Sequence, residues 1–257
     1  SVGAMRALVT LLTDFGTCDG YVAQIKGAIL SHAPDASIID VSHDIVPQDV
    51  THARFVLGRY WRRFPPGTVH LVVVDPGVGT ARAALAVEAD HRVLLGPDNG
   101  VLSAALGVDG ARAVALAVPR GGAPTFRGGG VFAPAVAAIT MGTPITQLGV
   151  PVDAPLCLRW PEPVSDERGR LTGEVIVIDR FGNAITNLPG PSRPGRVSLD
   201  ATELPVCRVY ADVEPGQPLA LTGSSGCVEI AVREGSAAPR FGLRRGTRVV
   251  LIPQATA

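Results

Sequence analysis

The sequence predicts an α/β protein in which a mostly parallel N-terminal sheet, flanked by helices, precedes a smaller C-terminal all-β domain with a barrel-like fold. In the first part of the chain, short apolar runs alternate with segments of helical periodicity. Beyond about residue 150 the helical periodicity stops, and short strand-like runs separated by Gly and Pro follow. The chain has 257 residues, of which 46% are hydrophobic, enough to bury two cores. We expect domains at residues 5–157 and 165–257.

The N-terminal domain is predicted from its alternating elements. The expected strands cover residues 7–12, 37–41, 68–75, 83–88, 92–95 and 111–118. The expected helices cover residues 20–32, 50–62 and 131–141, with a short helix after the turn at 95–103. Asp49 stands where its side chain can cap the helix at 50–62. Because strands separated by helices are usually parallel, the sheet is expected to be covered on both faces.

The C-terminal domain is predicted from a change of pattern. Four prolines, at positions 151, 155, 161 and 163, mark a linker. The strands expected after it cover residues 173–178, 195–199, 206–211, 218–222, 227–233 and 247–252. Their short length and their Gly- and Pro-containing turns are typical of a small barrel or sandwich.

Composition excludes several classes of protein. The chain has 23 Lys and Arg against 23 Asp and Glu, so its charge gives no reason to expect nucleic acid or an anionic membrane as partner. It has no apolar run near the roughly 20 residues that span a bilayer, and we expect a cytoplasmic protein. The four cysteines are scattered, at positions 18, 157, 207 and 227. They are expected to be buried free thiols, and no metal site is expected.

The segment VVVDPGVGTAR, residues 72–82, is the first candidate for chemistry. An apolar run ends at Asp75, a Pro-Gly turn follows, and Arg82 stands seven residues after the aspartate. Open α/β sheets place their chemistry at such strand ends, and the two side chains can meet across the loop. A strand end with an unrelated surface arginine explains the segment equally well.

Three further loops also place an acidic or amide side chain beside glycine at the end of an apolar run. They are LTDFG with Asp14, GPDNG with Asp98 and Asn99, and VIDRFGN with Asp179 and Asn183. Each alone is better explained as an Asx-turn, but four such loops favour a site for hydroxyl groups. The GSSG turn at 223–226 can receive a carboxylate through its N–H groups, although a hairpin turn is its simpler interpretation. The sequence contains no Walker A, HExxH or GxSxG motif.

Several motifs in this order resemble the S-adenosylmethionine (SAM) hydroxide adenosyltransferase family, which is similar to the SAM-dependent fluorinase and chlorinase. They are LTDFGTCDGYVAQIKG, VSHDIVPQD, FPPGTVHLVVVDPGVGTAR, LGPDNGVLS, IDRFGNAITN and GSSGCVEIAVREGSA. The resemblance implies an N-terminal α/β domain, a C-terminal β-barrel-like domain, and a homotrimer with SAM sites at the subunit interfaces. It also implies hydrolysis of SAM to adenosine and L-methionine, with SAM as the substrate and no cofactor.

The resemblance also implies roles for single residues. Asp75 and Arg82 match two of three catalytic positions, and the third carries Arg127 in the segment TFRGGG where the family has histidine. The expected substrate-binding residues are Asp14 and Asp19 at the ribose, Asp179 at the ammonium, Ser224 and Ser225 at the carboxylate, Phe181 and Asn183 at the adenine, together with Gln48 and Phe126.

Two departures from the halogenases favour water as the nucleophile. They have tyrosine at the position of Asp75, and the fluorinase has tryptophan at the position of Gln48. A carboxylate repels a halide but can accept a proton from water. Arg127 cannot act as a base at ordinary pH, so proton transfer is expected to rest on Asp75. Two alternatives stay open: a SAM- or adenosine-binding protein with little turnover, and a SAM-dependent halogenase.

Overall fold

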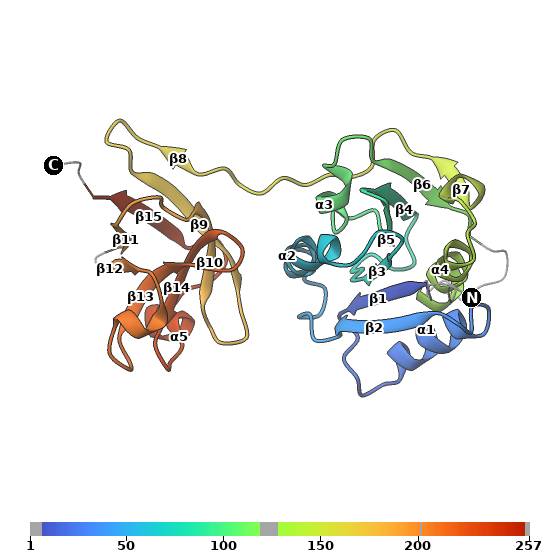
Figure 1. The fold of residues 1–257 in the computed structure, drawn as a ribbon, viewed down its shortest axis with the longest axis horizontal. Coiled ribbons are helices and arrows are strands. Elements are labelled where there is room, and N and C mark those ends of the chain that lie inside the picture. The colour runs from blue at the N-terminus through green and yellow to red at the C-terminus, as the bar shows by residue number, and fades with distance from the viewer. Residues whose placement is uncertain (1–6, 119–127, 201, 255–257) are drawn as a thin grey trace, which may run out of the picture. The chain divides into compact units, whose positions relative to one another are not determined.

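The chain folds into two compact units that divide after Leu158. The computed structural model describes residues 7–118, 128–200 and 202–254, and Figure 1 shows the order of their helices and strands. The first unit is α/β and the second is built mainly of strands, which confirms the predicted fold class.

The first unit is built on a seven-stranded sheet with the order β2-β1-β3-β5-β4-β6-β7. These strands are β1 (Leu8–Thr13), β2 (Ser37–Ser42), β3 (Val69–Val73), β4 (Ala84–Ala89), β5 (Arg92–Pro97), β6 (Arg112–Leu116) and β7 (Gly149–Pro151). The four strands β2, β1, β3 and β5 are parallel, whereas β4, β6 and β7 add antiparallel pairings. The parallel character that the sequence predicts therefore belongs to one half of the sheet.

The antiparallel half begins at a tight hairpin between β4 and β5. Ala89 pairs with Arg92, and the two residues between them, Asp90 and His91, have φ values of 48° and 57°. A two-residue loop with positive φ at both positions is a type I′ turn, which matches the twist of an antiparallel pair. So short a connection cannot join parallel strands, which need a crossover of a dozen or more residues.

Helices cover both faces of the sheet, because alternate strand residues point to opposite sides. Leu11 and Leu71 pack with α1 (Tyr21–Leu30) and α4 (Ala133–Thr140) in one core cluster. Leu12 and Val72 pack on the other side, with α2 (Val50–Tyr60) and α3 (Ser103–Leu106). A π-turn, η2 (Gly128–Phe132), leads into α4, and the short 3₁₀ turns η1 (Trp61–Arg63) and η3 (Ile145–Gln147) complete this unit.

The predicted cap of α2 is confirmed. The Asp49 side chain accepts a hydrogen bond from the His52 backbone N–H at 2.9 Å, which satisfies one of the unpaired donors of the first turn.

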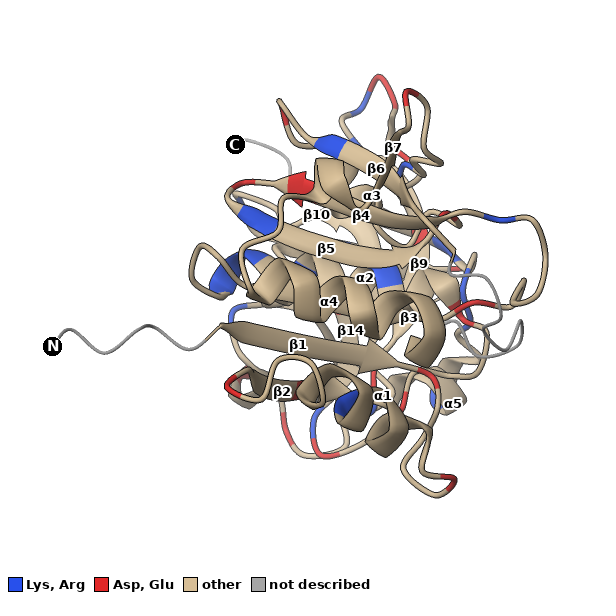
Figure 2. Ribbon diagram, turned by 90° about the vertical axis from the view of Figure 1, so that its right-hand side faces the viewer, with Lys and Arg blue, Asp and Glu red and all other residues tan. Residues whose placement is uncertain are grey.

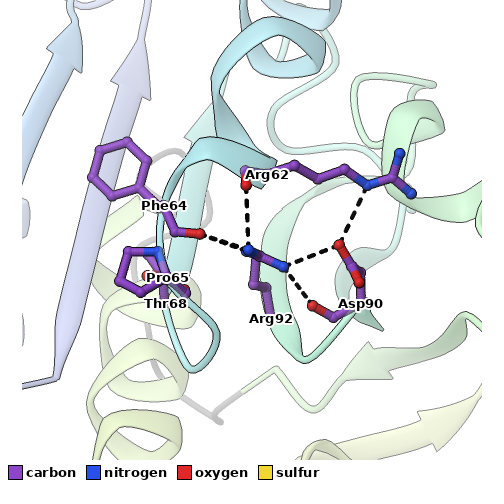
Figure 3. A network of polar contacts seen from close by, with 6 residues as sticks. All are labelled: Arg62, Phe64, Pro65, Thr68, Asp90 and Arg92. Atoms are coloured by element: carbon purple, nitrogen blue, oxygen red, sulfur yellow. Dashed lines mark hydrogen bonds and ion pairs between the residues drawn. The ribbon is translucent and has the colours of Figure 1, made fainter.

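A buried arginine fastens the segment that follows α2, at η1 and Phe64, to the β4–β5 hairpin (Figure 3). The Arg92 guanidinium donates to the carbonyls of Phe64, Arg62 and Asp90 at 2.6 to 3.2 Å, and to the Asp90 carboxylate at 3.0 Å. Arg62 also meets that carboxylate, at 3.4 Å. A guanidinium has several N–H donors in a rigid planar arrangement, so one side chain can satisfy three backbone carbonyls from two segments.

The second unit is a closed barrel of seven strands, with β8 added at its edge. Its strands are β8 (Val164–Ser165), β9 (Leu171–Ile178), β10 (Ala184–Pro189), β11 (Gly195–Leu199), β12 (Thr202–Cys207), β13 (Pro218–Thr222), β14 (Cys227–Val232) and β15 (Arg248–Pro253). Pairing of β10 with both β9 and β14 closes the ring. Two short helical segments, η4 (Tyr210–Asp212) and α5 (Ala237–Phe241), lie between strands, and the core is aliphatic.

Several details of the second unit differ from prediction, among them the short strand β8 and the short helix α5, which were not expected. The strand expected at 206–211 ends at Cys207, and η4 occupies the following residues, because the Asp212 carboxylate accepts the N–H groups of Arg208 and Val209 and turns the chain. The strand β10 was not expected, since its sequence AITNLP carries polar residues and a proline.

Acidic and basic residues are interspersed along the ribbon (Figure 2), in keeping with the balanced composition. Within the described ranges, no helix is long and apolar enough to cross a membrane.

The buried His70 makes the stability of the first unit depend on pH. His70 is fully buried, contacts Thr10 Oγ1 through Nδ1 at 2.7 Å, and packs against the rings of Tyr60 and Phe64. Burial, together with the positive charge of Arg92, lowers the pKa of His70 to about 4. The unfolded chain, with a His pKa of about 6.5, therefore binds this proton first as the pH falls.

We expect the free energy of unfolding to fall by about 3 kcal/mol between pH 6.5 and pH 4 on account of His70. A His70→Asn variant, which carries no titrating group there, should lose most of that dependence in urea unfolding series. The exposed His91, replaced by Asn, is the control for the effect of a His→Asn substitution itself. An unaltered pH profile in His70→Asn would contradict this account.

Candidate active site

The candidate residues of the first unit lie where the parallel strands of its sheet end, at their carboxyl-terminal side. The carboxyl ends of the parallel strands β2, β1, β3 and β5 meet there, and the chain passes from β2 on one side of β1 to β3 on the other. Ligands of open α/β sheets bind at such a switch point. Thr13 pairs with Val73, so Asp14 and Asp75 follow neighbouring strand ends one and two residues later.

The two carboxylate oxygens of Asp75 differ in their hydrogen bonding. Its Oδ1 accepts the Gly77 N–H at 3.0 Å and the Arg82 Nη1–H at 2.5 Å. Its Oδ2 is buried and has no hydrogen-bond partner among the described residues, and the whole side chain is only 5% exposed. Because a buried carboxylate oxygen without a partner is costly, this atom is the expected place for a small polar ligand such as water.

The backbone of the loop makes room for Arg82. A Cβ built on Gly77 would lie 2.5 Å from Arg82 Nη1, so only glycine lets the guanidinium lie against the chain here. The Thr80 hydroxyl donates to the Gly77 carbonyl at 2.7 Å and holds the turn between them. The structure thus joins Asp75 and Arg82, as the first interpretation of VVVDPGVGTAR requires.

Asp14 and Gln48 are joined across two loops. The Gln48 backbone N–H donates to Asp14 Oδ2 at 2.7 Å. Gln48 has a φ of 70°, a left-handed conformation that costs a residue with a Cβ about 1 kcal/mol or more. Such strain persists where the surroundings require it, and here it aims the N–H at the carboxylate. Asp19 is exposed, directly before the N-cap residue Gly20 of α1.

Thr13 and His43, which were not predicted site residues, join the loop of Asp14 to the segment that follows β2. The Thr13 hydroxyl contacts His43 Nδ1 at 2.9 Å and accepts the Phe15 N–H at 3.3 Å. The His43 carbonyl accepts the Gly16 N–H at 2.8 Å, and its ring is buried with Nε2 3.1 Å from Asp40 Oδ1. His43 therefore has a structural role, and it fixes the chain on both sides of Asp14.

The acidic and amide side chains of the GPDNG loop have structural roles. Asp98 Oδ1 accepts the Leu156 N–H at 2.7 Å, and the Asn99 side chain donates to the Val74 carbonyl at 2.8 Å. The Leu158 side chain rests on Gly100, where a Cβ would lie 2.3 Å from its Cδ1. The loop thus anchors the end of the first unit rather than presenting its acidic and amide groups to a ligand.

In the second unit, Asp179 organises the loop that carries Phe181 and Asn183. Asp179 Oδ1 accepts the N–H groups of both residues at 2.9 Å, and its Oδ2 accepts Asn183 Nδ2–H at 3.1 Å. Asn183 is buried, whereas Phe181 is 75% exposed and presents its ring to the surface. Both line a hollow of about 800 Å³ together with Tyr210, Arg233 and Ser236.

Ser224 and Ser225 lie in the turn between β13 and β14. The turn is closed by hydrogen bonds from Gly223 N–H to the Cys227 carbonyl and from Gly226 N–H to the Gly223 carbonyl, both at 2.9 Å. Ser225 Oγ accepts the Cys227 N–H at 3.4 Å. The hairpin interpretation of GSSG is thus confirmed, and binding of a carboxylate by the same turn stays a prediction.

Tyr210 and Glu229 are polar residues beside this loop that sequence reasoning missed. The Tyr210 hydroxyl donates to Glu229 Oε1 at 2.7 Å and accepts Asn183 Nδ2–H at 3.4 Å. Burial and the nearby carboxylates of Glu229 and Asp179 raise the pKa of Tyr210, so it stays protonated as a donor. The one signal in the sequence was an acidic residue inside the apolar run of β14.

Two predicted residues, Phe126 and Arg127, lie outside the described residues. In the part of the chain that the structure describes, no group of three His, Cys, Asp or Glu side chains could hold a metal ion. All four cysteines are free thiols, as expected, but they are not buried: Cys18 and Cys157 are exposed, and Cys207 and Cys227 are half-buried.

Comparison with known families covers both units. Residues 9–149 match the SAM hydroxide adenosyltransferase N-terminal domain, and residues 173–250 match the C-terminal domain of the same family.

Single relatives agree with this match. The chain is 40% identical to an (R)-S-adenosyl-L-methionine hydrolase from Thermus thermophilus, over 95% of this chain and 99% of the relative. It resembles the crystal structure of a Thermotoga maritima protein with a TM-score of 0.86 and 32% identity, over 95% and 99% of the two chains. A fluorinase from an Actinoplanes species is more distant, at 26% identity over 95% of this chain and 97% of the fluorinase.

The contact between Thr13 and His43 yields a local prediction. Thr13→Val keeps the shape of the side chain but removes the hydroxyl that meets His43 and Phe15 N–H. We expect the amides of Phe15 and Gly16 to exchange with solvent about 10-fold faster, the effect of losing about one net hydrogen bond. Hydrogen exchange followed by NMR measures this directly.

Thr140→Val is the matched control, since the Thr140 hydroxyl donates a hydrogen bond within α4, to the Ala137 carbonyl at 2.7 Å. If the exchange of residues 15 and 16 is the same in both variants, the Thr13 hydroxyl does not hold the loop.

Proposed function

Because the chain belongs to the SAM hydroxide adenosyltransferase family, we propose that it hydrolyses SAM to adenosine and L-methionine. The observation that carries the proposal is the buried Oδ2 of Asp75, which has no partner among the described residues, while the other oxygen is held by Arg82. This arrangement leaves one oxygen of a fixed carboxylate for a water molecule, and the nearby guanidinium can stabilise a developing hydroxide.

The reaction is an in-line displacement at C5′ of the ribose. The water oxygen forms a bond to C5′ while the C5′–S bond breaks. The electron pair of the C5′–S bond moves to sulfur. The sulfonium becomes the neutral thioether of methionine, and the proton of the attacking water passes to Asp75 Oδ2. No charge builds up on the leaving group, so the reaction needs no acid at sulfur and no cofactor.

The charge of Asp75 argues against a halide as nucleophile. Two unit negative charges 4 Å apart repel by about 4 kcal/mol near a protein surface. Arg82 offsets only part of this repulsion, because its guanidinium lies on Oδ1 and is therefore farther from a ligand at Oδ2 than that oxygen is. Water, which is neutral and donates a hydrogen bond, is favoured at the same place.

The substrate-binding roles follow the family resemblance and the geometry of each loop. Asp14, fixed by Gln48 N–H, receives the ribose hydroxyls, with Asp19 nearby, and Asp179 receives the ammonium. Phe181 and Asn183 form the adenine wall of the hollow. Ser224 and Ser225 bind the carboxylate of the methionine part. Phe126 is a further substrate-binding residue, and Arg127 is the third catalytic residue.

We also propose a cytoplasmic homotrimer with its sites at subunit interfaces. The family resemblance supports this, as do exposed apolar side chains of the first unit, among them Val46, Val78, Met141 and Val150, which assembly would cover.

Replacing Asp75 tests the proposed function. Asp75→Asn keeps the size of the side chain but removes the proton acceptor, so we expect the rate of adenosine formation from SAM to fall about 10² to 10⁴-fold. Chromatography of the products measures it. Asp109→Asn, which changes an exposed carboxylate between α3 and β6, should retain full activity.

Three outcomes would contradict the proposal. Unchanged hydrolysis in Asp75→Asn would remove Asp75 from the reaction. A halonucleoside peak in the presence of excess halide would make the protein a halogenase. Tight SAM binding by calorimetry without any product at high protein concentration would make it a binding protein.

The oligomeric state is tested separately. Light scattering coupled to gel filtration should give three times the chain mass of 26.6 kDa. A mass of one chain at micromolar concentration would contradict the trimer.

A further inference from the structure

The carboxylate of Glu229 does not line the hollow of the second unit, but it contacts Tyr210, which does. Glu229 is on β14 and is only 9% exposed, although it is an acidic residue in a barrel strand. Buried carboxylates are rare unless their hydrogen bonds are satisfied. Its contacts therefore need an explanation.

Each oxygen of Glu229 meets a different element. Oε1 accepts the Tyr210 hydroxyl at 2.7 Å, from the turn η4. Oε2 lies against Gly223 at the start of the GSSG turn, where a Cβ would be 2.4 Å away from it. Glu229 thus fills the space between the residue that walls the hollow and the turn that begins at Gly223.

The contacts continue through Tyr210 to the loop of Asp179. Asn183 Nδ2 reaches the Tyr210 hydroxyl at 3.4 Å and Asp179 Oδ2 at 3.1 Å. Tyr210 and Asn183 line the hollow, together with the exposed ring of Phe181. The hydroxyl of Tyr210 is therefore held on one side by Glu229 and on the other by Asn183, which fixes the direction in which the side chain extends from the backbone.

We propose that Glu229 is a positioning residue for substrate binding, which acts by holding the Tyr210 ring and Asn183 as one wall of the hollow. The proposal rests on the proposed function, because it takes the adenosine part of SAM as the occupant of the hollow. A wall that is already fixed binds a flat ring system without first losing the rotational freedom of the tyrosine.

The wall acts on the adenosine end, which does not change during the displacement at C5′. Its contribution is then equal in the ground state and the transition state. Loss of the contact should raise KM and leave kcat almost unchanged.

Three variants separate positioning from charge and from stability. Glu229→Leu removes the acceptor, and Tyr210→Phe removes the donor but keeps the ring. Glu229→Gln keeps a carbonyl oxygen that can accept the tyrosine hydroxyl, but carries no charge. Thr186→Val, which removes a buried bond to the Val228 carbonyl at 2.8 Å, controls for a loss of barrel stability.

We expect Glu229→Leu and Tyr210→Phe each to raise KM for SAM, and the dissociation constant of adenosine in calorimetry, about 10-fold. The value of kcat should change less than about 2-fold. Glu229→Gln should restore most of the affinity, Thr186→Val should leave it unchanged, and the double variant Tyr210→Phe/Glu229→Leu should be no weaker than either single variant.

Unchanged adenosine affinity in Glu229→Leu would overturn the proposal, as would additive losses in the double variant or a Gln variant as weak as the Leu variant. Adenosine binding is measured without turnover. A wild-type protein that binds adenosine but makes none from SAM would therefore refute the proposed function and still allow this test.

Discussion

The ion pair of Asp75 and Arg82 is the interaction on which the candidate site depends. It fixes one oxygen of the carboxylate. The other oxygen, which is buried and has no partner in the part of the chain that the structure describes, is therefore the one left for chemistry. The pair exists because β3 ends at the edge of the sheet, and because Gly77 leaves space for the guanidinium. A side chain at position 77 would overlap the guanidinium, so the arginine would have to shift from this position.

The parallel half of the sheet supplies the frame for this pair. Neighbouring strands β1 and β3 end in register, so the loop of Asp14 stands beside the loop of Asp75. The loop of Asp14 is fixed in turn by Gln48, in a strained conformation, and by the contact of Thr13 with His43. Rigid strand ends with short, mutually bonded loops are what a displacement reaction requires, since its rate depends on holding the nucleophile close to the carbon.

The sequence predicted most elements with a clear period or cap, and it failed where tertiary contacts decide. The helix at 50–62 and its Asp49 cap were recognised because both signals are local. The hairpin at Asp90 and His91 was not, because its turn lacks the Asn-Gly or Asp-Gly signal that usually marks one. Asp75 and Arg82 were identified as a pair from the resemblance and their spacing. Tyr210 and Glu229 were missed, since their contact joins residues 19 positions apart that only the closed barrel brings together.

The central claim is that Asp75 acts as a base on water and does not itself attack C5′. A single turnover of SAM in ¹⁸O-labelled water, with the enzyme in excess, tests it by mass spectrometry of the adenosine formed. If water attacks directly, the 5′-oxygen of adenosine carries the label in that first turnover. Unlabelled adenosine, with the label found in the protein, would mean that an oxygen of the protein attacked C5′, and would contradict the account.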